Sequence, residues 1–554
     1  MSANSSYFSQ TGTFNSLLKE GFRHYKGAQE AVLRNIEAIN DLSSMTKTAM
    51  GPNGMNKYII NMHDKLFLTK DTKVMTSELD INHPAANIIV DAAKAQDQEC
   101  GDGTNFVITL AGELLNHAGE LIVSGVHLSD IIVGYEKAFN KTLEYLDEAP
   151  TYEVSDLTDV KKVTSVIKPA IGSKMVHGQE TFLAPLIAQA CINVLPENKA
   201  KFNVDNVRVA KILGGSLMDT KVIQGLVVVR NVEGSVTKVE NCKVAVYNCP
   251  LETQGAETSD EVVFKNAEDL LNYTKGEEAH MESIIKRIVD SGVKAIVVGG
   301  SISNMAIHFL DKYQILAFRV TSKFELRRIA KALGATLLVR LGEPTPEEMG
   351  QVDSIAVTEI SSTKCIQIER SSDQNKLSTI ILRGTTNDML DNMEHVIEDG
   401  VNAYKAACKS AKYIPGAGAI EMFISNKVKE FGKTITTLDQ YGIDKFGEAF
   451  EVVPRILLEN SGHNVNEVLA TLRSKSLAEN STKKEGIDIK KGCIADVFDL
   501  GVYDHLETKR WGIKLAVNAA LTILRVDQVI VAKPAGGPNL NKKPPGMVNE
   551  QDEF

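Results

Sequence analysis

The sequence predicts a multidomain protein of mixed α+β and α/β class, in which an α/β domain is inserted into a mainly helical one. At 554 residues the chain is long enough for about three or four domains. Its composition, 43% hydrophobic and 24% charged, is that of a globular protein. Amphipathic helical segments dominate both ends of the chain, whereas strands alternate with helices from about 216 to 375.

Composition also restricts the class of function. A net charge of −10 argues against a nucleic-acid partner, which needs a basic surface. The seven cysteines are odd in number and form no CxxC pair, which favours reduced thiols over a disulfide frame or zinc site. The polar N-terminus carries no signal peptide, and we see no apolar run of the roughly 18 residues that a membrane helix needs. We expect a cytoplasmic protein without a membrane partner.

The N-terminal part reads as helices around one hairpin. Apolar residues recur at helical spacing over 28–50, and the predicted helix stops at the turn Gly51-Pro52-Asn53-Gly54. A hairpin follows over 58–69, with Asp71 just beyond its second strand. The helix at 28–50 places six apolar residues on one face: Val32, Ile36, Ile39, Leu42, Met45 and Ala49. Three more helices are expected at 84–98, 105–123 and 129–147.

The middle of the chain changes character twice. Helices mix with short strands over 150–215, and a regular alternation of strands and helices follows. Within it, 251–283 is long, charged and only partly apolar, as expected of an insertion that projects from a core; an ordinary surface loop with a helix is the alternative. The predicted helix 322–334 has a core face and a basic stripe.

Helical character returns near Thr385. Helices are expected at 388–410, 418–432, 440–460 and 513–524, followed by a strand at 528–532. The tail 533–554 lacks apolar residues and is predicted to be disordered.

A turn at Gly101-Asp102-Gly103-Thr104-Asn105 is the most informative motif. It opens a helix, and glycines, free backbone N–H groups and a helix N-terminus together suit a phosphate group. The carboxylate of Asp102 would repel phosphate unless Mg²⁺ lies between them. The alternative is an ordinary Gly-Asp-Gly turn.

Two further segments have the same kind of chemistry. Pro415-Gly416-Ala417-Gly418-Ala419 is a Gly-rich turn before a helix that contains Glu421, although tight packing alone explains such a turn. The segment 394–400 carries Glu394, Glu398 and Asp399, which are usually solvated acids on a helix surface. With Asp71 and Asp102, Asp399 would supply the carboxylates that hydrolysis of a Mg-bound phosphoanhydride needs. Spacing alone leaves their convergence open.

These motifs together resemble the group II chaperonins. The resemblance runs in one order along nearly the whole chain and rests on eight segments: 51–57, 68–71, 101–105, 399–400, 415–419, 458–462, 501–504 and 519–530. The narrower resemblance is to one subunit type of the eukaryotic cytosolic chaperonin (TRiC/CCT), carried by 101–105, 202–209, 323–328 and 532–538.

The resemblance implies three domains. It gives an equatorial ATPase domain from 1–149 and 411–532, an intermediate domain from 150–215 and 376–410, and an apical α/β domain at 216–375. The segment 251–283 would be a helical protrusion that serves as a built-in lid.

The same resemblance assigns roles to residues. Asp102 would coordinate Mg²⁺, and Asp399 would be the hydrolytic carboxylate, with Asp71 as a second carboxylate near the attacking water. Asp504 would bind the ribose hydroxyls, and Asp488 would lie near the base. The remaining contacts to ATP or ADP would come from Met50, Gly51, Pro52, Gly103, Thr104, Asn105, Gly416, Ala417 and Gly418.

The implied activity is ATP-driven folding of non-native proteins, such as actin and tubulin, by lid closure. The implied partners are paralogous subunits in an eight-membered double ring, non-native clients and co-chaperones. The basic residues of helix 322–334 become a candidate client-binding surface, with a solvated helix face as the alternative: Lys323, Arg327, Arg328 and Lys331.

Three departures from the family pattern concern turnover. Thr72-Lys73 replaces the usual Gly-Ala after Asp71, Asn105-Phe106 replaces hydroxyl residues, and Ala417 stands within the usual glycine run. We expect this subunit to bind ATP but to hydrolyse it slowly. Two alternatives stay open: a structural and client-contacting subunit with little or no hydrolysis, and a small-molecule kinase or ligase, which the lack of a Walker or kinase motif disfavours.

Overall fold

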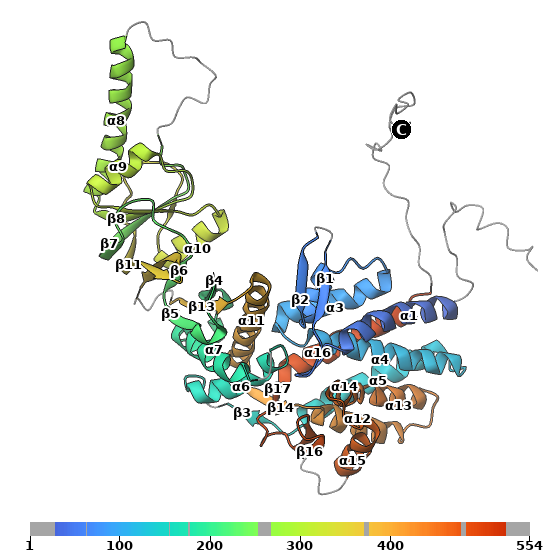
Figure 1. Cartoon of the computed structure of the whole chain (residues 1–554). Coiled ribbons are helices and arrows are strands. Elements are labelled where there is room, and N and C mark those ends of the chain that lie inside the picture. Colours follow the sequence, from blue (N-terminus) through green and yellow to red (C-terminus); the bar gives the residue numbers. More distant parts are fainter. Residues whose placement is uncertain are drawn as a thin grey trace, which may run out of the picture.

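The computed structural model describes residues 28–527 apart from 62–63, 155, 176–177, 253–266, 371–375 and 478–483. Three parts follow one another in space: a helical body built from both ends of the chain, a smaller middle part, and a sheet-centred part furthest from the helical body (Figure 1). The observed architecture is mixed helix and sheet, as the sequence predicts.

The helical body surrounds helix α4 (Thr104–Val123), which starts at the candidate phosphate turn. Its side chains Val107, Leu110 and Leu114 are fully buried, because helices pack against it on several sides. The other helices of this body are α1 (Ala28–Lys47), α2 (Thr72–Glu78), α3 (Pro84–Cys100), α5 (Leu128–Asp147), α12 (Ala419–Gly432), α13 (Asp439–Ala449), α14 (Val452–Ser461), α15 (Val465–Leu477) and α16 (Leu506–Leu524).

By length and composition α4 alone among the described helices is apolar enough to cross a membrane, which the sequence reading overlooked. However, 83% of its apolar window is buried inside the protein. The apolar character of α4 is therefore accounted for by its place at the centre of the helical core.

Most helices lie where the sequence predicts them, with four differences. The last helix, α16, starts at Leu506, seven residues before the expected start at 513. The helix expected at 440–460 is two helices, α13 and α14, and the break at 450–451 precedes Pro454. A proline ring clashes with the carbonyl four residues earlier, here that of Phe450, so one continuous helix is disfavoured. Helices α2 and α15 were not predicted, and Met45, expected in the core, is exposed.

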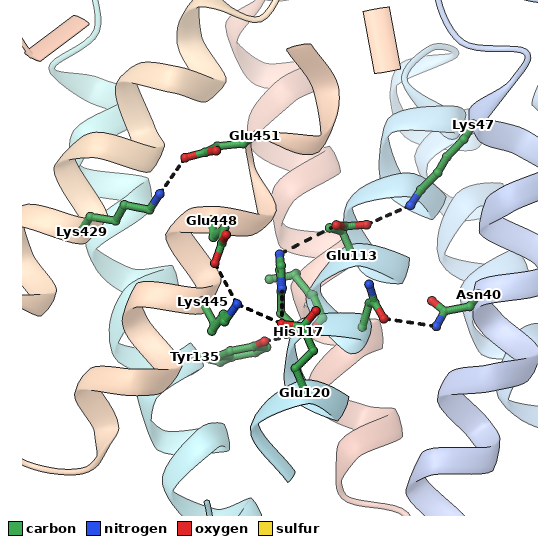
Figure 2. Close-up of polar contacts among 12 residues, drawn as sticks. Asn40, Lys47, Glu113, His117, Glu120, Tyr135, Lys429, Lys445, Glu448 and Glu451 are labelled. Carbon is green, nitrogen blue, oxygen red and sulfur yellow. Dashed lines mark hydrogen bonds and ion pairs between the residues drawn. The ribbon is translucent and has the colours of Figure 1, made fainter. Parts of the chain in front are cut away.

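A line of charged side chains joins α4 to its neighbours (Figure 2). Lys47 of α1 binds Glu113 at 2.8 Å, and Lys445 of α13 binds Glu120 at 2.9 Å. His117 lies between the two glutamates, 3.8 Å from Glu113 and 3.3 Å from Glu120. Because α4 starts at the turn 101–105, these contacts fix the position of that turn relative to α1 and α13.

The middle part combines helices with a small sheet. Helix α11 (Asn387–Lys409) packs on α6 (Val160–Gly172) and α7 (Glu180–Val194). A Cβ on Gly400 of α11 would lie 3.0 Å from Ile187 and 3.2 Å from Ile171, so the glycine permits this close approach. The sheet has the order β4 (Val207–Leu213), β13 (Ser378–Gly384) and β5 (Lys221–Gln224). Hydrogen bonding therefore places β5 with the middle part.

The sheet-centred part is a layered α/β unit. Alternate residues of β7 (Lys238–Tyr247) face opposite sides of its sheet: Val244 packs in a core that includes α10 (Lys323–Leu333), and Ala245 in one that includes α8 (Ala267–Asp290) and α9 (Asn304–Lys312). The other strands are β6 (Leu226–Val228), β8 (Val293–Val298), β9 (Leu316–Arg319), β10 (Leu337–Leu338), β11 (Gly350–Ile360) and β12 (Thr363–Glu369).

Several expectations fall partly outside the described residues. These are 253–266 of the expected insertion 251–283, all of the strand at 528–532 and all of the tail 533–554. The end of the expected insertion forms the first part of α8.

Short strands complete the helical body and its junction with the middle part. The predicted hairpin is confirmed as the antiparallel pair β1 (Lys57–Ile60) and β2 (Leu66–Thr69). A three-stranded sheet joins segments far apart in sequence: β3 (Tyr152–Glu153), β14 (Lys412–Pro415) and β17 (Tyr503–His505). A further antiparallel pair is β15 (Glu485–Asp488) and β16 (Cys493–Asp496).

Glu451, at the break between α13 and α14, is a buried carboxylate that accepts hydrogen bonds from Ser425 at 3.2 Å and Lys429 at 2.6 Å, and from Arg473. Burial opposes its ionisation, but the hydrogen bonds from Arg473 and Lys429 outweigh burial and hold the pKa of Glu451 below its ordinary value. The ionised carboxylate therefore links α12 and α15 to the helical core.

We expect Glu451→Gln to lower the free energy of unfolding at neutral pH by about 1–3 kcal/mol, measured by urea unfolding of the full chain. Because the folded pKa is lowered, this stability is present above the unfolded pKa of about 4.3 and is lost as the pH falls through the folded pKa. Glu430→Gln, which removes an exposed partner of Lys427, is the control and should change little. An equal loss in acid and at neutral pH would contradict the account.

Candidate nucleotide site

A cavity of about 1150 Å³ opens where the helical body meets α6 and the end of α11. Fourteen residues were predicted to bind nucleotide or to act on it, and twelve of them line this cavity. The other two, Gly416 and Asp399, do not line it. Both stand beside it: a Cβ on Gly416 would lie 3.1 Å from Asp504, and Asp399 contacts Lys174 in its wall. The twelve are Met50, Gly51, Pro52, Asp71, Asp102, Gly103, Thr104, Asn105, Ala417, Gly418, Asp488 and Asp504.

The turn 101–105 is shaped by two glycines in the left-handed region. Gly101 ends α3 at φ 71°, and its N–H donates to the Asp97 carbonyl at 2.8 Å. Gly103, at φ 84°, is the N-cap of α4 and leaves the first backbone N–H groups without a side-chain cap. Gly418, at φ 79°, does the same for α12. Two uncapped helix N-termini at one cavity form an anion-binding environment.

Three predicted carboxylates meet at one buried ammonium. Lys174, just after α6, places Nζ 2.5 Å from Asp399 Oδ2, 3.5 Å from Asp71 Oδ1 and 3.8 Å from Asp102 Oδ1. The sequence reading missed Lys174, and no local pattern distinguishes it from an ordinary surface lysine. Its ammonium offsets the repulsion among three acids that lie far apart along the chain.

Burial dominates the ionisation of this cluster. It raises the pKa of Asp399 to about 7, with Lys174 opposing the rise and the charges of Asp71 and Asp102 adding to it. Burial likewise raises the pKa of Asp102. Burial lowers the pKa of Lys174, but the three carboxylates outweigh it, so its pKa is raised and the ammonium stays charged. Asp399 and Asp102 therefore hold a proton more readily than an ordinary aspartate does. A second cation at the site would lower the pKa of these carboxyl groups.

Only one of the two carboxylate oxygens of Asp71 accepts a hydrogen bond. As the N-cap of α2, its Oδ1 accepts the Lys73 N–H at 3.2 Å, whereas Oδ2 is buried without a hydrogen-bond partner. An orphaned carboxylate oxygen suits a water molecule or a metal-bound ligand. Within the described residues, no group of three or more His, Cys, Asp or Glu side chains is arranged to hold a metal ion.

The other end of the cavity is also built from paired charges. Lys509 of α16 lies 3.0 Å from Asp504, contacts the buried Glu421, and stands 4.1 Å from the centre of the Phe106 ring. Burial raises the pKa of Glu421, with Lys509 opposing it. Asp488 accepts backbone N–H groups of Lys490 at 3.0 Å and Lys491 at 3.4 Å, so one of its oxygens shapes the turn after β15.

Two residues that depart from the family pattern, Lys73 and Asn105, form specific polar contacts. Lys73 lies 3.3 Å from Asp97 and 3.9 Å from Glu398, outside the Lys174 cluster. The Asn105 side chain donates to the Thr46 carbonyl at 3.1 Å and accepts from the Thr109 hydroxyl at 3.1 Å. The Asn105 side chain therefore connects α4 to α1. Its backbone N–H is the group that remains for a ligand in the cavity.

Lys70 is a second residue that the sequence reading missed. It lines the cavity with 9% of its surface exposed, and its Nζ donates to the Pro52 carbonyl at 2.9 Å. Burial lowers its pKa. Among the described residues, its ammonium pairs with the Pro52 carbonyl and with no carboxylate.

The candidate client surface lies elsewhere, on α10. The core face predicted for this helix is confirmed, because Leu326, Ile329, Ala330 and Leu333 are buried. Lys323, Arg327, Arg328 and Lys331 are exposed, as is Phe324 at 72%. The basic stripe therefore has an exposed aromatic ring beside it.

Ala417 adopts φ 50°, a left-handed conformation that costs a non-glycine residue about 1–2 kcal/mol. We expect Ala417→Gly to raise the free energy of unfolding by about 0.5–1 kcal/mol, because relief of this strain exceeds the added entropy of the unfolded chain. Urea unfolding of the full chain measures it. Ala138→Gly, inside helix α5, is the control and should destabilise; equal losses in both variants would contradict the strain at 417.

Comparison with known proteins agrees with the geometry. The sequence profile of the TCP-1/cpn60 chaperonin family matches residues 42–534. The chain is 44% identical over 531 residues to T-complex protein 1 subunit theta of Dictyostelium discoideum, covering 96% of this chain and 98% of that protein. The subunit theta of Gallus gallus is 44% identical over 540 residues (98% and 97%), and that of Arabidopsis thaliana 45% over 525 (94% and 95%).

These relatives confirm the narrower resemblance as well as the broad one, since the relatives compared are theta subunits that align over nearly their whole length. The chain belongs to the TCP-1/cpn60 chaperonin family.

Proposed function

We propose that this chain is an ATP-dependent folding subunit of a hetero-oligomeric cytosolic chaperonin, with its nucleotide in the cavity between the helical body and α6. One observation carries the proposal: Asp71 and Asp102 of the helical body meet Asp399 of α11 around a single buried ammonium. The family relationship supports the class of activity.

The residues divide the work by position. The uncapped N-termini of α4 and α12 would bind phosphate oxygens, with Asp102 as the protein ligand of Mg²⁺. Mg²⁺, when bound, neutralises the phosphate charge that develops on hydrolysis. Asp71, with its free Oδ2, and Asp399 would orient and deprotonate the attacking water. Asp504 would bind the ribose, and Lys70 a phosphate oxygen.

The position of Asp399 on α11 suggests how hydrolysis is coupled to movement. Asp399 belongs to the middle part, whereas the turn 101–105 belongs to the helical body, so any shift between these parts changes the distance between them. A site that is complete in only one arrangement links turnover to domain closure.

We assign the helical body to an equatorial domain, the middle part to an intermediate domain and the sheet-centred part to an apical domain, with the lid around 251–283. The limits are those given above, except that β5 (Lys221–Gln224) is assigned to the intermediate domain because it pairs with β13. Exposed apolar side chains on the β1–β2 hairpin, Tyr58 and Ile60, support contacts with neighbouring subunits. The proposed partners are paralogous subunits in an eight-membered double ring, non-native clients and co-chaperones, in the cytoplasm.

A subunit that binds ATP with little or no hydrolysis is the second candidate. The β-branched Thr72 directly follows Asp71 and has a buried hydroxyl without a partner, which restricts the backbone beside the proposed hydrolytic carboxylate. Asn105 also lacks a hydroxyl for the phosphate side.

Single-turnover hydrolysis separates the two candidates. In an assembled complex in which only this subunit keeps its hydrolytic aspartate, we expect slow but measurable loss of ATP, and Asp399→Asn should reduce it by about 10²-fold or more. Nucleotide binding should persist in that variant, since Asp399 does not line the cavity. A rate equal to that of the other subunits would contradict slow turnover, and an unchanged rate in the Asn variant would contradict the role of Asp399.

The exposed face of α10 is the proposed client contact. We expect the triple change Lys323→Glu, Arg327→Glu and Lys331→Glu to weaken crosslinking of acidic non-native clients to this subunit several-fold, because the local charge reverses. The same triple change to Gln is the intermediate control. Crosslinking that is unaffected by charge reversal would mean that the stripe is only a solvated helix face.

A further inference from the structure

His505 is held between three elements at the edge of the proposed nucleotide cavity. It ends β17, is the N-cap of α16 and lines the cavity beside Asp504. Its Nδ1 accepts the backbone N–H of Thr508 at 3.2 Å and lies 3.0 Å from the Thr508 hydroxyl. Its Nε2 lies 2.9 Å from the carbonyl oxygen of Ser410.

These contacts fix the protonation state of the ring. A backbone N–H only donates, so Nδ1 must be the unprotonated acceptor. A carbonyl only accepts, so Nε2 must carry the hydrogen. The arrangement therefore needs the neutral Nε2–H form of His505. A second proton on Nδ1 would remove the cap and place a positive charge at the N-terminus of α16, where the helix dipole disfavours it.

His505 connects Ser410 to Thr508, and both residues adjoin elements of the proposed nucleotide site. Ser410 directly follows α11, the helix that carries Asp399. On the other side, the Thr508 carbonyl accepts a hydrogen bond from Gln96 at 3.1 Å, and the same amide donates to the Asp102 carbonyl at 3.0 Å. One residue further, Lys509 holds Asp504. His505 thus joins the end of α11 to both ends of the cavity.

The surroundings of the ring oppose its protonation. Burial lowers the pKa of His505, although the Ser410 carbonyl and the charge of Glu507 on α16 act in the other direction. From β14, Tyr413 meets the ring edge to face at 5.5 Å, and burial raises the pKa of its phenol, so it stays neutral.

Other charged groups come from each neighbouring element. Lys409 ends α11 next to Ser410, and Lys412 stands next to Tyr413 on β14. Lys168 of α6 lines the same cavity. On β17 itself Asp504 is paired with Lys509. Glu507 of α16 acts on the imidazole as well, and Arg510 of the same helix lies 3.6 Å from its carboxylate.

We propose that His505 is a proton-sensitive positioning residue, whose neutral form ties the end of α11 to the nucleotide cavity and whose protonation weakens nucleotide binding by this subunit. This inference rests on the proposed nucleotide site. Because the folded pKa is lowered, a fall in pH through the ordinary value of about 6.5 protonates the detached ring first and stabilises the released arrangement. The neutral link is complete above that pH.

The test uses the assembled complex with this subunit tagged. Photolabelling by 2-azido-ATP is measured for this subunit relative to the other subunits of the same particle, which cancels the titration of the probe itself. From about pH 7.5 to about pH 6 we expect relative labelling of the wild type to fall up to about fourfold, the limit set by protonating a detached ring of pKa about 6.5 over this range. His505→Asn, which caps a helix without titrating in this range, should remove the decline.

His127→Asn is the matched control, because His127 is also a histidine N-cap, of α5, but lies outside the cavity. It should decline like the wild type. A decline that persists in His505→Asn, or a flat wild-type profile, overturns the inference. If the Asn variant does not enter the complex, His505→Thr, another capping residue, is read in the same way. Absence of labelling at every pH in the wild type would instead refute the proposed nucleotide site.

Discussion

The arrangement of the whole site depends on one buried ammonium. Lys174 holds together three aspartates that lie at positions 71, 102 and 399, and it does so from a segment just beyond α6. Without a cation, three carboxylates at this separation could not remain ionised in a buried setting. The protein thus keeps a positive charge where the proposed function brings a metal-bound polyphosphate.

The fold makes this cluster a meeting point of separate parts. Asp71 is fixed as the N-cap of α2, and Asp102 accepts the Gly103 N–H just before α4. Helix α4 is held against its neighbours by a buried apolar face and a line of ion pairs. Asp399 is held by the packing of α11 on α6 and α7 at Gly400. Each carboxylate is therefore rigid within its own part, and their separation reports the relation between the parts. His505 is a second connection of the same kind, because it bridges α11 and α16.

Sequence patterns were sufficient where physics is local. The helix at 28–50, the hairpin and the turn at 101–105 followed from periodicity, glycine placement and strand alternation. Lys174 and Lys70 could not be found in this way, since only the tertiary structure shows that Lys174 meets three carboxylates and that Lys70 is buried. Pro454 gave a local signal for the break at 450–451, but the apolar periodicity around it favoured one continuous helix in the prediction. The convergence of Asp71, Asp102 and Asp399 came from family resemblance rather than from spacing.

The central claim is that these three aspartates and Lys174 surround a Mg-bound triphosphate. A structure of the assembled complex with Mg²⁺, ADP and a γ-phosphate transition-state mimic tests it most directly. The account predicts that Asp102 ligates the metal, that Asp71 and Asp399 face the attacking water, and that Lys174 leaves Asp399 for the phosphate mimic. A mimic bound with Asp399 still paired to Lys174, out of reach of that water, would contradict it.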